Sequence, residues 1–143
     1  MQYVSTRGEA PTLNFSDVLL EGLAIDGGLY LPEEWPTTTI ENITASIESD
    51  SSYRDVAVEV LKPFTSGSLT QSELTELVQR AYEPFTHPET IPLKEVGSNM
   101  WLMELFHGPT LAFKDVALQL VGQMFDHELE KKQQRITIVG ATS

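Results

Sequence analysis

An apolar strand pattern near the end of the sequence constrains the fold most strongly. Residues 135–139 read Arg-Ile-Thr-Ile-Val, and the small or hydroxylated residues 140–143 follow them. This order is typical of a buried parallel strand that leads into a β–α turn. Such a strand needs neighbouring strands and a crossover helix to cover its apolar faces. We therefore expect an α/β fold, and we expect these 143 residues to be the N-terminal part of a longer protein.

The charge balance excludes two classes of partner. The sequence contains 21 acidic residues and 9 Lys or Arg residues, and residues 1–60 hold 11 of the acids but only 2 of the bases. Nucleic-acid phosphates and anionic lipid headgroups are both bound by clustered Lys and Arg. We therefore expect neither nucleic acid nor a membrane surface as a partner, and we interpret the acidic N-terminal part as a solvated surface.

Residue types that the sequence lacks narrow the chemistry further. It contains no cysteine, which excludes a disulfide framework, a thiolate nucleophile and a Cys-based metal site, and which fits a reducing compartment. No secretory signal opens the chain, and no apolar stretch approaches the roughly 20 residues that cross a bilayer. No group of His, Asp and Glu has the spacing of metal ligands.

Turn and cap residues divide the first 52 residues. A strand is expected at residues 3–6, followed by a helix from Phe15 that Asn14 or Ser16 caps, and a further strand at 29–31. The run Asp26-Gly27-Gly28 predicts a tight turn with at least one glycine at positive φ, where a Cβ would clash. Residues 32–52 are rich in Pro, Ser, Thr and Glu, which predicts mostly loop with room for a helical turn at 43–47.

Two helices are expected in the middle of the chain. The first runs from Tyr53 to about Leu61, because its apolar residues share one face and Pro63 should stop it. The second begins at a capping box formed by Thr70 and Glu73 and ends before Pro84.

After about residue 88 the pattern changes. Residues 91–96 and 100–106 predict a hairpin around a three-residue turn at 97–99, and residues 113–131 predict the longest helix. We place a domain boundary here, with a small α/β domain at 1–88 and the beginning of a second domain at 89–143.

Lys114 is the strongest candidate for a catalytic residue. It follows the turn Gly108-Pro109-Thr110 and lies at or near the first turn of the expected helix. The partial positive charge of a helix N-terminus favours the neutral amine, and the apolar residues Phe113 and Val116 would add desolvation. Schiff-base chemistry needs such an amine. The same spacing also fits an ordinary surface lysine, and Asp115 fits a first-turn acid that interacts with the helix dipole.

The stretch around Lys114 resembles a known family. Residues 104–117, Glu-Leu-Phe-His-Gly-Pro-Thr-Leu-Ala-Phe-Lys-Asp-Val-Ala, are similar to the lysine signature of the threonine synthases, within the serine/threonine dehydratase group of pyridoxal-phosphate enzymes. Residues 5–8, 22–32 and 139–143 are similar to the family's opening, its N-terminal-domain signature and the strand before its Ser-Gly-Asp-Thr-Gly loop. The resemblance therefore extends over the whole chain in the family's order.

This resemblance implies a fold-type-II enzyme that depends on pyridoxal 5'-phosphate, truncated within its catalytic domain. Lys114 would bind the cofactor as a Schiff base beside Phe113, and Thr142 and Ser143 would begin the loop that binds the substrate carboxylate. The intact enzyme would be a cytoplasmic carbon–oxygen lyase of threonine biosynthesis, converting O-phospho-L-homoserine and water to L-threonine and phosphate. The chain alone is expected to be inactive, since the loop for the cofactor phosphate would lie downstream.

Two alternative functions stay open on the sequence alone. Threonine dehydratase, another member of the group, would share the lysine signature, although the Asp-Gly-Gly-Leu-Tyr stretch at 26–30 is not expected in it. A non-catalytic binding module would keep the lysine helix and lack the rest, although the chain ends inside the expected β–α turn.

The remaining polar candidates are weaker. His107 lies within the lysine signature and is interpreted as a structural turn residue or a neighbour of the cofactor. His87 and His127 are expected at the surface. Arg7 either contacts an anion in the assembled active site or belongs to a segment that caps a strand.

Overall fold

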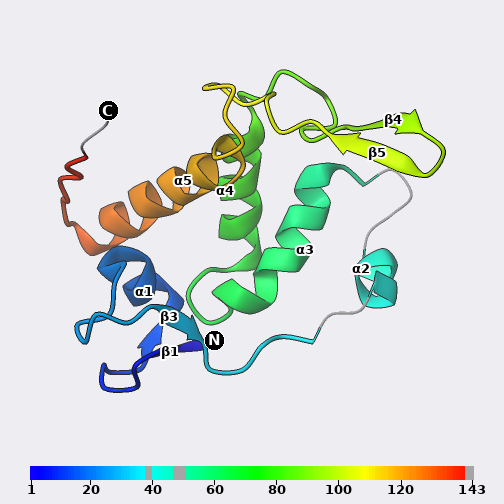
Figure 1. Ribbon diagram of the computed structural model, residues 1–143. Coiled ribbons are helices and arrows are strands. Elements are labelled where there is room, and N and C mark those ends of the chain that lie inside the picture. The colour runs from blue at the N-terminus through cyan, green and yellow to red at the C-terminus, as the bar shows by residue number, and fades with distance from the viewer. Residues whose placement is uncertain (38–39, 47–50, 141–143) are drawn as a thin grey trace.

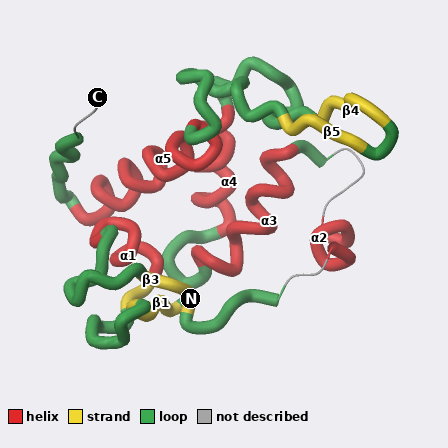
Figure 2. Tube along the Cα trace, viewed as in Figure 1, coloured by secondary structure: helices red, strands yellow, loops and turns green. Residues whose placement is uncertain are grey.

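Three helices form the centre of the molecule. The computed structural model describes residues 1–37, 40–46 and 51–140. In Figure 1, α4 (Gln71–Tyr82) lies between α3 (Tyr53–Thr65) and α5 (Asp115–Lys132), with strands near the N-terminus at one end and a hairpin at the other. Figure 2 shows that more of the chain is helical than extended in strands. The predicted α/β class is confirmed.

A small antiparallel sheet carries the N-terminus. Its central strand β1 (Gln2–Ser5) pairs with β2 (Leu13–Asn14) on one side and with β3 (Tyr30–Pro32) on the other. Helix α1 (Phe15–Glu21) follows β2 directly, and the Asn14 side chain accepts a hydrogen bond from the Asp17 N–H. This cap confirms the prediction that Asn14 or Ser16 opens the helix.

The predicted glycine turn is confirmed, and it surrounds a hydrogen-bonded carboxylate. Gly27 has a φ of +79°, and a Cβ on Gly28 would lie 2.2 Å from the Ser5 hydroxyl oxygen. Four donors reach the Asp26 carboxylate within 3.0 Å, namely the Ser5 hydroxyl and the backbone N–H groups of Gly28, Glu9 and Ala10. Burial alone would raise the pKa of Asp26, but these bonds together lower it.

The expectation that Pro63 stops its helix is wrong. Helix α2 (Ile40–Ser46) is short, but α3 continues through Pro63 to Thr65. Pro63 lies in the last turn, where the loss of one N–H donor affects a single bond. The buried Thr65 hydroxyl donates to the carbonyls of Leu61 and Lys62 at 3.3 and 3.4 Å, which satisfies acceptors at the helix end.

The main core lies around α4. The capping box of Thr70 and Glu73 opens this helix as predicted. One face of α4 is buried, and the same core includes Leu120 and Met124 of α5. The core cluster consists of Val58, Leu69, Leu74, Leu77, Val78, Ala81, Tyr82, Phe85, Leu120 and Met124. It therefore contains residues from both sides of position 88, and the domain boundary placed there stays a prediction.

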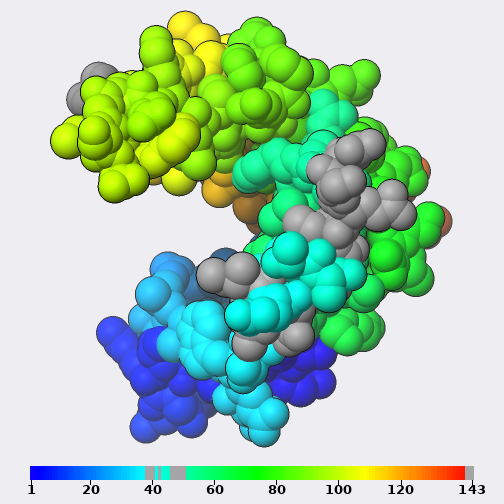
Figure 3. All heavy atoms as spheres, turned by 90° about the vertical axis from the view of Figure 1, so that its right-hand side faces the viewer, coloured from blue at the N-terminus to red at the C-terminus, as the bar shows by residue number. Residues whose placement is uncertain are grey.

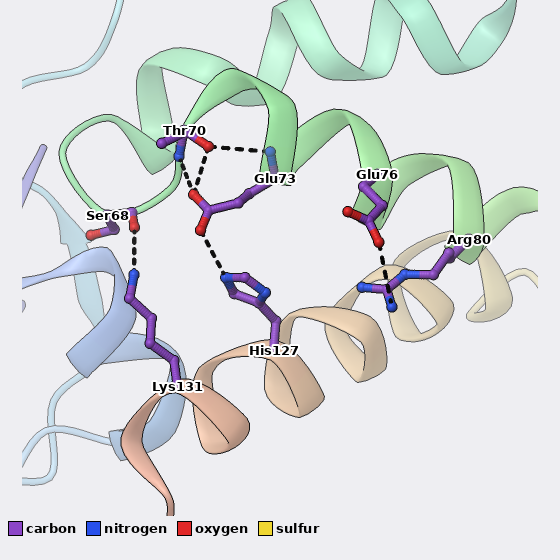
Figure 4. A network of polar contacts seen from close by, with 7 residues as sticks. All are labelled: Ser68, Thr70, Glu73, Glu76, Arg80, His127 and Lys131. Carbon is purple, nitrogen blue, oxygen red and sulfur yellow. Dashed lines mark hydrogen bonds and ion pairs between the residues drawn. The ribbon is translucent and has the colours of Figure 1, made fainter.

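A polar network joins α4 to α5 alongside this core. Figure 4 shows Glu73 between its cap residue Thr70 and the ring of His127, whose Nε2 lies 3.5 Å from the Glu73 carboxylate. The His127 side chain is 22% exposed, and its Nε2 atom is buried. His127 is partly exposed and its ring faces the Glu73 carboxylate on the neighbouring helix, so the expectation of a surface histidine is met only in part.

The predicted hairpin forms, with a shorter turn than expected. Strand β4 (Leu93–Gly97) pairs antiparallel with β5 (Met100–Met103), and Gly97 lies opposite Met100. The turn therefore has two residues, and Asn99 within it has a φ of +58°. Gly97, which the sequence pattern places in the turn, belongs to β4 instead. The pairing register shifts between Glu95 and Gly97 to accommodate this residue. All nine strand residues are exposed.

The strand expected at residues 135–139 is absent from the described structure. This segment has no regular secondary structure, and Ile138 and Val139 are 80% and 89% exposed. A strand forms by hydrogen bonding to a neighbour, and none of the described residues pairs with this segment. Thr142 and Ser143 lie outside the described residues.

An apolar groove opens between α1, α3 and α5. Its volume is about 500 Å³, and its lining includes Phe15, Tyr53, Phe64, Val116 and Leu120. Figure 3 shows that the molecule is hollowed on one side, between its N-terminal part and the region around the hairpin.

Among the described helices, none is long and apolar enough to cross a membrane.

Candidate active site around Lys114

Lys114 lies where the sequence placed it, at the start of α5. It has helical backbone angles, φ −61° and ψ −23°, and its carbonyl accepts the N–H groups of Ala117 and Leu118 at 3.1 and 2.8 Å. Its side chain is exposed and, among the described residues, has no hydrogen bond or ion pair. By contrast, Lys62, Lys131 and Lys132 each have a polar partner. The Lys114 amine is therefore accessible and has no polar partner among the described residues.

The apolar cover expected for Lys114 is not present in the described structure. Phe113 is 65% exposed and Leu111 is 70% exposed. Val116 is partly buried, but it lines the apolar groove between the helices. The expectation that Phe113 desolvates the amine is therefore not met by the residues described.

The backbone before Lys114 is held by one buried acid. We call residues 107–115 the lysine turn. Asp115 is 3% exposed, and its carboxylate accepts hydrogen bonds from both the N–H and the hydroxyl of Thr110 at 2.8 Å. Burial alone would raise the pKa of Asp115, but the hydrogen bonds from Thr110 and Gln119 together lower it. The carboxylate is therefore ionised at neutral pH.

His107 is fixed at the other end of the lysine turn. Its Nε2 lies 2.8 Å from a carboxylate oxygen of Glu104, and both side chains are less than one-fifth exposed. Its carbonyl accepts the Thr86 N–H at 2.9 Å, and its ring lies against that of His87, with centroids 5.0 Å apart. His87 is partly exposed, and its Nδ1 accepts the Glu89 N–H at 3.2 Å, which agrees with the surface position expected for it. These contacts give His107 a structural role in the turn.

Arg7 has a structural contact far from Lys114 in the sequence. Its Nη1 donates to the Asp26 carbonyl at 2.7 Å, next to the glycine turn. A Cβ on Gly27 would lie 2.7 Å from this same nitrogen. The described geometry therefore ties Arg7 to the folding of the N-terminal loops.

The sequence does not predict two features of the lysine turn. Its pattern predicts Asp115 as a first-turn acid that interacts with the helix dipole, while the structure shows a buried hydrogen-bond acceptor. It predicts Gly108 as a turn residue, while in the structure a Cβ there would lie 2.5 Å from Asp115. The sequence signal for both features is a hydroxyl residue five positions before a first-turn acid. A glycine lies two positions before that hydroxyl residue. Among the described residues no group of His, Asp and Glu forms a metal site.

Comparisons with known proteins identify the family. A family model described as "Threonine synthase N terminus" matches residues 2–82. The threonine synthase of Pseudomonas aeruginosa is 49% identical over the full 143 residues, and that of Schizosaccharomyces pombe is 42% identical. The chain spans about 30% of the length of these relatives.

A solved structure has the same fold. The crystal structure described as PLP-bound threonine synthase from Brucella melitensis superposes with a TM-score of 0.88 at 52% identity, over 94% of this chain and 29% of that one. The N-terminal match disfavours the alternatives of a dehydratase and of an unrelated binding module. This chain belongs to the threonine synthase family and corresponds to the N-terminal portion of its members.

Proposed function

We propose that this chain forms the N-terminal part of a pyridoxal-phosphate-dependent threonine synthase, in which Lys114 binds the cofactor. The observation that carries the proposal is the unpaired Lys114 amine at the first turn of α5, on a turn held by Asp115. Relatives named threonine synthase, and a related structure described as PLP-bound, support this assignment. The proposed reaction converts O-phospho-L-homoserine and water to L-threonine and phosphate.

The residues present fit such a cofactor. An uncharged primary amine condenses with an aldehyde, and no described side chain competes for the Lys114 Nζ atom. Phe113 precedes Lys114 in the sequence and is exposed, and the resemblance assigns it to the cofactor as well. When bound, pyridoxal phosphate acts as an electron sink for carbanion chemistry. Lys114 holds the cofactor through Nζ, and the same nitrogen, when released, takes up and returns protons.

Further residues enter the proposal by resemblance. Thr142 and Ser143 begin the loop whose backbone N–H groups would bind the substrate carboxylate. Residues 1–88 form the N-terminal domain, and residues 89–143 begin the cofactor domain. The absence of cysteine fits a cytoplasmic enzyme.

The test traps the cofactor on its lysine. The full-length enzyme is incubated with pyridoxal phosphate and reduced with borohydride, and the modified lysine is identified by peptide mass spectrometry. We expect the unmodified enzyme to carry the label on Lys114 and to release phosphate from O-phospho-L-homoserine. The Lys114→Ala variant should lose both the label and the phosphate release. Lys94→Ala, which alters an exposed lysine of the hairpin, is the matched control. Label on another lysine, or turnover by Lys114→Ala, would contradict the proposal.

A further inference from the structure

The carboxylate of Asp115 is fully engaged, although it adjoins an exposed reactive lysine. Oδ2 accepts the Thr110 N–H and Oδ1 accepts the Thr110 hydroxyl, both at 2.8 Å, and the Gln119 amide donates to Oδ1 at 3.4 Å. A first-turn acid that acts only on the helix dipole needs no partner in the preceding loop. Asp115 instead bonds to a residue five positions upstream. It therefore connects the loop to the helix.

Gly108 brings the loop into direct contact with this carboxylate. A Cβ at this position would lie 2.5 Å from both Cβ and Oδ2 of Asp115. Between them, Leu111 has a φ of +61°, which is a strained conformation for a residue with a branched side chain. Such conformations persist where the surroundings fix the backbone. The lysine turn is thus held in one shape by contacts on the Asp115 side chain.

The held shape determines where Lys114 points. The Asp115 N–H donates to the Ala112 carbonyl at 3.0 Å, and the Lys114 carbonyl accepts from the next turn of α5. The backbone of Lys114 is therefore fixed from both sides, while its side chain extends outward.

On the basis of the function proposed above, we propose that Asp115 is the positioning residue for the cofactor-binding lysine. Its carboxylate fastens Gly108 and Thr110 to the first turn of α5 and so sets the direction in which the Lys114 side chain leaves the helix. Catalysis depends on such placement, since a displacement of about 1 Å can slow a reaction about 100-fold. Asp115 acts through Lys114 and need not touch cofactor or substrate.

The experiment compares variants of the full-length enzyme. Asp115→Asn changes one acceptor of the pair, and Thr110→Val removes the hydroxyl donor. Thr110→Ser keeps the hydroxyl and serves as the conservative variant. Asp126→Asn changes an exposed acid on the same helix and is the matched control. Thermal melting of each variant shows which are folded at the assay temperature.

Three quantities are measured on the folded variants. We expect Asp115→Asn and Thr110→Val to slow formation of the borohydride-reducible link at Lys114, and to lower kcat, by about 10- to 100-fold with KM nearly unchanged. In the cofactor-free protein, hydrogen exchange at the Thr110 amide should accelerate in Asp115→Asn. Thr110→Ser and Asp126→Asn should match the unmodified enzyme.

The outcomes separate this inference from the proposed function. If the unmodified enzyme forms no link at Lys114, both proposals are wrong. If it does, and Thr110→Val and Asp115→Asn link at the unmodified rate, the positioning role alone is overturned. Should Asp115→Asn fail to fold, Thr110→Val decides, because its smaller change leaves the Thr110 N–H bond intact.

Discussion

The helical body around α4 buries its apolar residues, whereas the hairpin of β4 and β5 exposes them. Leu74, Leu77 and Val78 of α4 are at most 1% exposed. In the hairpin, Trp101 is 57% exposed and Leu102 is 49% exposed, and both faces of the two strands are open. A two-stranded ribbon has no second layer to cover it. The helical body around α4 is therefore stabilised by its own core, while the hairpin exposes apolar surface.

Large-to-small substitutions should separate these two regions most clearly. Leu77→Ala is expected to lower the free energy of unfolding by about 2–5 kcal/mol, because it leaves a cavity in the core. Leu102→Ala should change it by no more than about 0.5 kcal/mol, since that side chain already contacts solvent. Urea denaturation followed by circular dichroism measures both. Equal losses would contradict the difference between the regions.

A methyl group added to a glycine should affect the N-terminal sheet more than the hairpin. Gly28→Ala should cost about 1–3 kcal/mol, because its Cβ would lie 2.2 Å from the Ser5 hydroxyl oxygen. Gly97→Ala in β4 is the control, since its nearest neighbour would be 3.9 Å away, at ordinary contact distance. Thermal melting should show a clear loss for the first variant only. A stable Gly28→Ala would mean that the glycine turn yields to the added atom.

The stability that Glu73 contributes where α4 meets α5 should depend on pH. The bonds from Thr70 are the main cause that lowers the pKa of Glu73, with Lys131 and His127 adding to them. A lowered pKa in the folded state stabilises the protein above the unfolded value of about 4.3, and this contribution is lost as pH falls through the lower folded value.

Glu73→Gln should therefore cost at most about 1 kcal/mol at neutral pH, because Gln can still reach the Thr70 N–H but the negative charge at the helix N-terminus is lost. Its deficit relative to the unmodified chain should shrink as the pH is lowered below about 4. The control is Glu76→Gln on the same helix, whose partner Arg80 forms an exposed pair. Denaturation midpoints between pH 7 and pH 3 measure the effect. A constant deficit over that range would argue against the ionised Glu73 as its source.

The smallest expected effect is a gain. Gly122→Ala, in the interior of α5, should stabilise the chain by about 0.5–1 kcal/mol, because alanine costs less conformational entropy in a helix and its Cβ meets nothing within 4 Å. Differential scanning calorimetry of the two chains checks it. A loss of stability would show that α5 is bent or covered at this position in solution.

The caps and turns of the first 82 residues could be predicted because their sequence signals are local. The Asn14 cap, the Thr70–Glu73 capping box and the positive φ of Gly27 each depend on residues a few positions apart. The expectation for Pro63 was wrong because a proline in the last turn removes only one N–H donor, so the helix continues to Thr65.

Features that depend on distant partners were predicted less well. Residues 135–139 have the composition of a strand, but a strand also needs a partner, and no described residue supplies one. The place of Lys114 followed from its turn and helix, whereas the burial of Asp115 depended on how closely Gly108 approaches. Composition around Lys114 suggested a dry site, and the exposed Phe113 shows that sequence neighbours alone do not exclude water.

The core fixes α5 close to Lys114. Leu120 and Met124 of α5 are buried in the core, and the Tyr82 hydroxyl of α4 donates to the Val116 carbonyl at 2.9 Å, two residues after Lys114. The contact between α4 and α5 therefore places the first turn of α5. If Lys114 binds the cofactor as proposed, substitutions at this contact should change turnover although every residue of the lysine turn is unchanged.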